Sequence, residues 1–180
     1  MSSAMSDPFM VRMARSGLRW LPLGAAAILL DQLTKEWIQR ALALHDSITV
    51  LPVLEIVHWR NTGAAFSFLA GAGGWQRWLF TLFALGVSVA LLVWLSRLDG
   101  RQQKLQSSGL MLIAAGALGN VIDRFRHGYV VDFIAVHWNE AWFPAFNVAD
   151  SCITVGAGLI LLDALLDARR RKQAQGEQAP

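Results

Sequence analysis

Two aspartates occupy one aromatic-rich segment between hydrophobic stretches, where their residue type and position suit acid–base chemistry. Asp132 stands in the string at residues 130–133, and Asp150 stands in the string at residues 146–151. A carboxylate close to lipid is costly unless it is paired, hydrated or used, so an ionisable residue there indicates function. Two carboxyls on one side of a membrane predict that one takes a proton from water while the other donates a proton to a scissile carbonyl.

The two aspartates differ in their surroundings. Asp132 is flanked by Val131 and Phe133, so apolar surroundings are expected to favour its protonated form. Asp150 follows Asn147 by three residues, a spacing that is also typical of a helix N-cap with a capping box, which is a purely structural role. In that role the helix N-terminus favours the ionised carboxylate. Two carboxyls with such different surroundings, sharing one proton, are what an aspartic protease requires.

Composition and pattern indicate a membrane protein. Of the 180 residues, 54% are hydrophobic and only 16% are charged, unlike an ordinary soluble domain. Four apolar blocks approach the roughly 20 residues that a membrane span needs. They cover residues 18–33, 78–95, 109–122 and 148–166. We therefore expect a mainly α-helical bundle of four transmembrane helices.

Basic clusters predict the orientation of this bundle. They precede the first block and follow the second and fourth, so with four spans all three clusters lie on one side. The positive-inside tendency makes that side the cytoplasm, with both termini there and both aspartates toward the periplasm. We expect a cytoplasmic extension at residues 1–17, the membrane domain at 18–168 with a periplasmic loop at 40–75, and a disordered tail at 169–180. The net charge of +3 needs no nucleic acid to explain it.

The first block also has features of a cleavable signal peptide. It has a basic start, an apolar stretch and a string at residues 41–43 that mimics a cleavage site. Asp31, Lys35 and Glu36 interrupt the region before that string, and cleavage would leave an odd number of spans. A retained anchor is therefore the better interpretation.

The loop after the first block has its own predicted structure. Residues 47–58 are rich in β-branched side chains and contain Pro52, which favours a short, irregular sheet at the membrane interface. Several tryptophans near the outer boundary are best interpreted as an interfacial aromatic belt. They are Trp59, Trp75, Trp78, Trp138 and Trp142.

The third block carries small and polar residues at helical offsets that place them on one face. They are Gly109, Gly116, Gly119, Asn120 and Asp123. We interpret the glycines as packing residues, because small side chains let another helix approach closely. Asn120, Asp123 and Arg124 are interpreted as a polar group that orients a neighbouring site. A plain ion pair of Asp123 with Arg124 or Arg126 is the structural alternative.

Two further strings carry polar residues. Asp31 and Lys35 are spaced by four residues with the acid first, which is the favourable order for an ion pair on a helix. This pair either neutralises charge at a membrane boundary or faces the site. Asn61 begins a string of small residues at 61–67 that suits either the close approach of a peptide ligand or the end of a strand. The residue types alone leave these alternatives open.

Other chemistries are less well supported. Cys152 has no histidine near it in the sequence, so it is interpreted as a small packing residue. The four histidines are scattered without the spacing of metal ligands, so a zinc protease is not indicated and no metal or cofactor is expected. The sequence contains no Gly-rich phosphate loop and no G-x-S-x-G string.

Five strings together resemble the lipoprotein signal peptidases, or signal peptidase II, in the family's order and over roughly residues 20–168. The strings lie at residues 31–35, 61–67, 116–124, 131–133 and 146–151. The resemblance implies a four-helix inner-membrane aspartic protease with a small periplasmic β-cradle. It also implies cleavage of the signal peptide just before a diacylglyceryl-modified cysteine.

The resemblance assigns roles residue by residue. It places the catalytic pair at Asp132 and Asp150 and implies a larger group for support and substrate binding. That group is Asp31, Lys35, Asn61, Gly63, Phe66, Asn120, Asp123, Arg124, Phe146 and Asn147. The implied partners are diacylglyceryl-modified prolipoproteins and membrane lipid, with inhibition by globomycin-type cyclic peptides.

Two other classes of protein remain as alternatives. A small proton-coupled transporter also uses intramembrane acids, but such sites usually lie near the midplane, in broken helices and often within repeats. Here the acids cluster at one face and no repeat is visible. The other alternative is a lipid-binding or assembly protein without catalysis.

Overall fold

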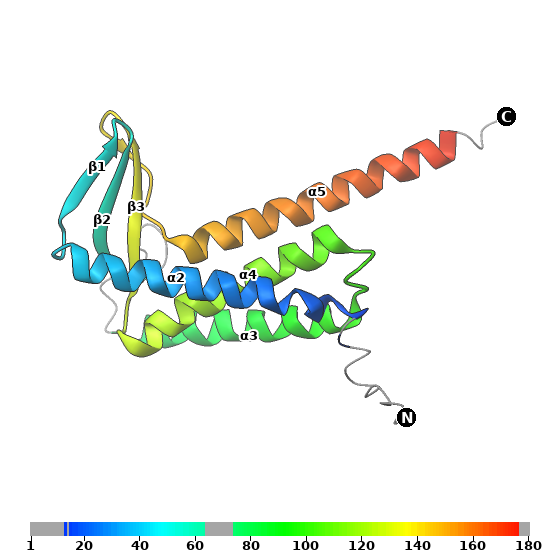
Figure 1. Cartoon of the computed structure of the whole chain (residues 1–180), viewed down its shortest axis with the longest axis horizontal. Helices are drawn as coiled ribbons and strands as arrows, with labels where there is room; N and C mark the ends of the chain where they lie inside the picture. The colour runs from blue at the N-terminus through cyan, green and yellow to red at the C-terminus, as the bar shows by residue number, and fades with distance from the viewer. Residues whose placement is uncertain (1–12, 14, 64–73, 177–180) are drawn as a thin grey trace, which may run out of the picture.

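A computed structural model describes residues 13, 15–63 and 74–176 of the chain. Its helical elements are the short 3-10 helix η1 (Gly17–Trp20) and the helices α2 (Leu21–Ala41), α3 (Trp75–Arg97), α4 (Lys104–Arg126) and α5 (Val148–Gly176). Its strands are β1 (Ser47–Leu51), β2 (Leu54–Asn61), β3 (Val130–Trp138) and β4 (Ala141–Trp142). The long helices form a bundle, and the sheet stands across one end of it (Figure 1).

Three of the described helices are long and apolar enough to cross a membrane, by length and composition: Arg77–Arg97, Lys104–Arg126 and Val148–Gln175. Lys104–Arg126 is the central helix, because 67% of its most apolar window is buried inside the protein, against 17% and 11% for the other two. The fourth helix, α2, has 21 residues and contacts α4 and α5. The expected bundle of four helices is confirmed.

Glycines let α4 and α5 approach closely. A Cβ atom added to Gly109 would lie 2.7 Å from the carbonyl oxygen of Gly156, and one added to Gly156 would lie 2.5 Å from that of Gly109. Gly116 meets the backbone carbonyl of Ala149 in the same way. The predicted packing role of Gly109 and Gly116 is therefore confirmed.

α5 is longer than the fourth apolar block predicts. It continues to Gly176, so residues 169–176, which the sequence analysis assigned to a disordered tail, are helical. The physical reason is composition, because the alanine, arginine, lysine and glutamine residues of this stretch are good helix formers. The end of α5 projects beyond the other helices (Figure 1).

The expected irregular sheet is also confirmed. It is antiparallel with strand order β1-β2-β3-β4, and its register shifts between Ile56 and Trp59 of β2. Beyond this shift Trp59 lies opposite Asp132. Ile38 of α2 packs with Val131 and Phe133 of β3 in a buried cluster, which attaches the sheet to the end of the bundle.

The segment before α5 is tied to the sheet through its backbone. The N–H of Phe146 donates to the carbonyl of Ile134 at 3.0 Å, and the N–H of Ile134 donates back to the carbonyl of Phe146 at 2.9 Å. Asn147 and Asp150 follow directly, at the start of α5. This pairing therefore brings the N-terminus of α5 beside Ile134 in the middle of β3, two residues after Asp132.

Candidate active site

Asn147 holds both aspartates of the predicted pair. Its side-chain Nδ2 donates to Asp132 Oδ1 at 2.8 Å, and its backbone N–H donates to Asp150 Oδ2 at 3.2 Å. Its Oδ1 accepts from the backbone N–H of Asp150 at 3.0 Å. The last two bonds are the reciprocal pair of a capping box, so the capping arrangement predicted at the start of α5 is confirmed. One buried asparagine therefore fixes both carboxyls relative to each other.

The remaining carboxyl oxygens are held by two other asparagines. Asn61 of β2 donates to Asp132 Oδ2 at 3.0 Å, and Asn120 of α4 donates to Asp150 Oδ1 at 2.8 Å. Each of the four oxygens thus accepts one N–H, and no acidic hydrogen is needed to satisfy them.

Burial sets the protonation of Asp132. Burial, assisted by the negative charge of Asp150, raises the pKa of Asp132 to about 7 against the opposing hydrogen bonds from Asn61 and Asn147 and the charge of Lys35. This is the direction expected from the apolar neighbours of Asp132 in the sequence. Near neutral pH, Asp132 can therefore hold or release a proton.

Lys35 lies behind this pair in a buried polar network. Its Nζ is 2.9 Å from Asp31 Oδ2 and 2.9 Å from Asp123 Oδ2, and it donates to Asn120 Oδ1 at 3.0 Å. All three charged side chains are at most 2% exposed. The predicted Asp31–Lys35 pair is confirmed. The alternative pairing of Asp123 with a neighbouring arginine is wrong, because Lys35 reaches Asp123 from another helix.

The same network joins the elements that carry the pair. Asp31 Oδ1 accepts the N–H of Ala149 at 2.9 Å, in the first turn of α5. Asp123 Oδ2 accepts the N–H of Val131 at 3.1 Å, next to Asp132 in β3. Gln32 Nε2 donates to Asp31 Oδ2 at 3.1 Å and to Asp123 Oδ1 at 3.0 Å. Sequence reasoning gave Gln32 no role, although it stands next to Asp31.

A pocket of about 990 Å³ opens in front of the two aspartates. Of the predicted group, Asn61, Gly63, Asn120, Arg124 and Phe146 line it together with Asp132 and Asp150. Asp31, Lys35, Asp123 and Asn147 are buried behind its wall. Phe66 lies outside the described residues. The predicted group therefore divides into residues that reach the pocket and residues that hold those in place.

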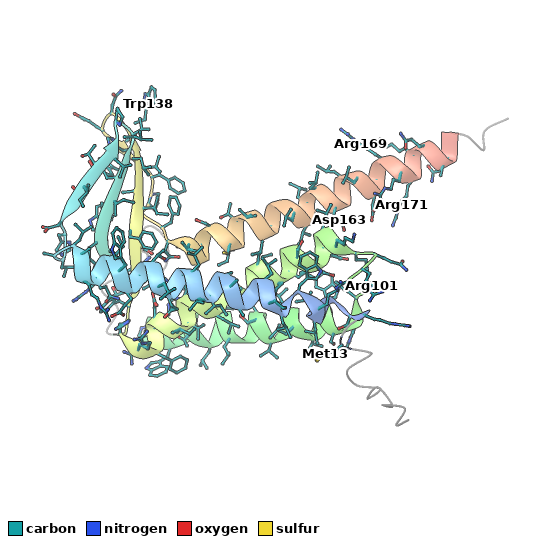
Figure 2. The ribbon with its side chains drawn as sticks, in the orientation of Figure 1. Met13, Arg101, Trp138, Asp163, Arg169 and Arg171 are labelled. Carbon is teal, nitrogen blue, oxygen red and sulfur yellow. The ribbon has the colours of Figure 1, made fainter. Side chains whose placement is uncertain are left out.

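Aromatic residues that the sequence analysis assigned to a membrane belt also line the pocket. Trp59 and Trp142 lie with their ring centroids 6.4 Å apart, and Phe143 lies beside Phe146 at 6.1 Å. Nothing in the sequence separates these pocket residues from ordinary interfacial aromatics. Trp138, by contrast, is 73% exposed at the far tip of the sheet (Figure 2). The pocket therefore has a polar floor and an aromatic wall.

Within the described ranges, no group of three or more His, Cys, Asp and Glu side chains is arranged to hold a metal ion.

Asp132 and Asp150 lie together, each held by asparagine side chains, at the end of a bundle in which three of the described helices are long enough to cross a membrane. Two adjacent carboxyls of this kind are the arrangement that a membrane peptidase of the aspartic class requires. Residues 23–166 match the family described as signal peptidase (SPase) II. The chain belongs to this family, and it is a multi-pass membrane aspartic peptidase with lipoprotein signal peptidase function.

Relatives and solved structures agree with this assignment. The chain is 51% identical over 161 residues to a lipoprotein signal peptidase of Shewanella pealeana, covering 89% of this chain and 94% of that protein. It is 48% identical over 161 residues to one of Shewanella halifaxensis, with the same coverage of 89% and 94%. A bacterial membrane enzyme solved by the in meso method at 2.3 Å superposes with a TM-score of 0.73 at 34% identity, covering 82% of this chain and 88% of that one.

Proposed function

We propose that Asp132 and Asp150 are the catalytic pair that hydrolyses the peptide bond before a diacylglyceryl-modified cysteine of a prolipoprotein. The observation that carries this proposal is the bridge through Asn147, which fixes both carboxyls at the floor of one pocket. The names of the relatives support the substrate class, since they are lipoprotein signal peptidases.

The proposed reaction gives the two acids different roles and assigns the shared proton to Asp132, whose pKa burial raises to about 7. Asp132 holds the shared proton and donates it to the scissile carbonyl oxygen, while Asp150 takes a proton from the attacking water. Hydroxide adds to the carbonyl carbon and gives a tetrahedral intermediate. The carbon–nitrogen bond then breaks as the leaving amine takes the proton from Asp150, and Asp132 regains its own proton from the intermediate. Water is consumed and the pair returns to its starting state.

The pKa of Asp132 predicts a fall in activity at high pH. Because the acid must be protonated and its pKa is about 7, kcat should decline as pH rises through that value. Asn61→Leu removes a hydrogen bond that stabilises the ionised carboxylate, so the pKa should rise and the decline should move to higher pH. A pH profile of kcat for both proteins checks this.

Thr62→Val is the control for this profile, because Thr62 lines the same pocket next to Asn61. The kcat of Thr62→Val should decline over the same pH range as that of the wild type. A decline in Asn61→Leu at the same or lower pH would contradict the proposed acid.

The lipid on the substrate is expected to position the scissile bond. The floor of the pocket lies at the end of the membrane helices, and a precursor reaches it at the correct depth only if the cysteine stays anchored. Burial of an acyl chain contributes roughly 0.8 kcal/mol per CH₂, which is enough to hold that position. A bond misplaced by about 1 Å reacts some 10²-fold more slowly, so an unmodified precursor should be cleaved about 10²-fold more slowly than the lipidated one.

Single-turnover rates under saturating enzyme separate this effect from binding. Equal rates for the lipidated and unmodified precursors would show that the lipid does not position the scissile bond. A globomycin-type cyclic peptide is expected to compete with the precursor for the same pocket. At the concentration at which this peptide binds the enzyme, it should therefore block cleavage of the lipidated precursor.

We further propose that the sheet and pocket face the periplasm and that both termini are cytoplasmic. Basic residues gather at the opposite end of the bundle, including Arg101, Arg169 and Arg171 (Figure 2), as the positive-inside tendency requires. Reporter fusions after Gln173 should therefore give a cytoplasmic signal and fusions at Asn139 a periplasmic one. A periplasmic signal from Gln173 would overturn this orientation.

A further inference from the structure

At the end of the bundle opposite the sheet, the segment before α2 is bonded to the loop between α3 and α4. The N–H of Gly17 donates to the carbonyl of Leu98 at 3.0 Å, and the N–H of Gly100 donates to the carbonyl of Arg15 at 3.0 Å. Trp20 Nε1 donates to the carbonyl of Gly100 at 3.2 Å. We call residues 15–20 and 97–104 together the basal clamp. Its two segments are 80 residues apart in sequence but form one structural unit.

The basal clamp is tightly packed at its centre. A Cβ atom at Gly17 would lie 2.7 Å from the carbonyl oxygen of Leu95, and one at Gly100 would collide with the carbonyl of Ser16. The same Cβ position at Gly100 is 2.9 Å from Cδ of Arg19, so the side chain of Arg19 lies across this turn. Because the backbone is fixed by hydrogen bonds and close packing, a ligand here would need to order only side chains.

The clamp carries a concentrated positive charge. Its five basic residues are all exposed, and within the described part of the chain none of them is in a salt bridge. They are Arg15, Arg19, Arg97, Arg101 and Lys104. The clamp contains one acid, Asp99, so five positive charges and one negative charge leave a formal charge of +4.

Asp99 offsets only one of the five positive charges, and its side-chain hydrogen bonds go to backbone N–H groups. Its Oδ1 accepts the backbone N–H groups of Arg101 at 2.8 Å and Gln102 at 3.1 Å, so it serves to close the turn. These hydrogen bonds, and then the charges of Arg101 and Arg15, lower the pKa of Asp99. The charges of Arg15 and Arg101 thus act on the carboxylate of Asp99, in the same turn that the side chain of Arg19 crosses. Three arginines are therefore carried by one small, packed turn, since Arg15 accepts the N–H of Gly100 through its carbonyl, Arg19 lies across Gly100 and Arg101 follows it.

We propose that the basal clamp binds the phosphate of an anionic phospholipid in the leaflet at this end of the bundle. Guanidinium groups bind phosphate oxygens through paired, charge-assisted hydrogen bonds, and they are less strongly hydrated than ammonium groups. Trp20, half-buried beside these arginines, is the kind of side chain that lies at the level of lipid headgroups. A headgroup whose phosphate has no compensating cation, such as that of phosphatidylglycerol, fits the excess positive charge.

The distal part of α5 provides a matched comparison. Arg169, Arg170 and Arg171 are also exposed, although Arg170 forms an exposed pair with Asp167 at 3.4 Å. They lie on a single helix that projects past the bundle, and Arg169 and Arg171 are separated from Arg101 (Figure 2). They raise the general surface potential without forming a packed surface. If the clamp is a specific phosphate site, removing its three arginines should weaken lipid binding more than removing the three arginines of α5. If only general charge attraction acts, both changes should weaken binding equally.

The test uses the full chain in phosphatidylcholine nanodiscs with increasing phosphatidylglycerol, and it measures bound lipid by native mass spectrometry and the midpoint of thermal unfolding. Arg15→Gln/Arg19→Gln/Arg101→Gln should lower the apparent affinity for phosphatidylglycerol by about tenfold or more and remove the lipid-dependent rise in the midpoint. The control Arg169→Gln/Arg170→Gln/Arg171→Gln should retain both. Equal losses in the two triple variants, or no lipid dependence in the wild type, would overturn the proposal.

A single-residue variant and a phosphate control complete the test. If the triple variant in the clamp unfolds during purification, Arg101→Gln alone is the fallback variant. Among the described residues, the hydrogen bond of Arg101 to the turn comes from its backbone N–H, so this change should preserve the fold. The variant should still lower the affinity for phosphatidylglycerol, and an unchanged affinity would overturn the proposal. Inorganic phosphate added to phosphatidylcholine nanodiscs distinguishes the source of the ligand. An equal rise in the midpoint with phosphate alone would overturn the assignment to lipid.

Discussion

Asp132→Asn and Asp150→Asn are each expected to lower the single-turnover rate of precursor cleavage by about 10²–10⁴-fold while the protein remains folded. Asp132→Asn removes the proton that the scissile carbonyl should receive, and Asp150→Asn removes the base that should activate water. Because the two acids act as a unit, the double variant should be little slower than either single variant. Rates measured with a lipidated precursor in detergent check all three.

The fold should tolerate these changes because an amide oxygen still accepts one of the surrounding hydrogen bonds. Asp46→Asn is the matched control, since Asp46 is an exposed aspartate in the loop between α2 and β1. It should cleave at close to the wild-type rate. Cleavage at a near-normal rate by Asp132→Asn or Asp150→Asn would exclude that residue from the catalytic pair.

Local spacing was sufficient to predict the parts of the site that lie within one helix. Asp31 and Lys35 stand four residues apart in α2, and Asn147 and Asp150 stand three apart at the start of α5, so helical geometry alone fixes which atoms meet. The number of helices followed equally well from the apolar blocks, because span length is a simple physical constraint.

The contacts between elements were not accessible from spacing. Asp123 has arginines close by in sequence, yet it pairs with Lys35, because helix packing places α2 beside that face of α4. Trp59 faces Asp132 only because of the register shift in β2, which the residue types do not encode by themselves. Both features depend on how whole elements pack, so a single sequence leaves them undetermined.

Lys35→Met is expected to be the most destabilising single change in the network. The lysine is 2% exposed and lies between two carboxylates that are themselves 1% and 2% exposed. Removing it leaves two buried negative charges without a cation, and breaking a buried ion pair in this way costs about 3–5 kcal/mol in the free energy of unfolding. Reversible unfolding in mixed detergent micelles should report a loss of this size, together with a lower kcat, since Asn120 and the N-terminus of α5 lose their support.

Arg40→Met provides the matched control on the same helix. Arg40 also pairs with an acid four residues earlier, Glu36, at 2.7 Å, but the two side chains are 77% and 37% exposed. An exposed pair of this kind contributes about 0.5 kcal/mol, so this variant should be close to the wild type in stability and rate. Adding Asp123→Asn to Lys35→Met should recover part of the lost stability, because it removes one of the stranded charges. If Lys35→Met and Arg40→Met had the same small effect, the buried network would not be what holds α2, α4, α5 and β3 together around the two aspartates.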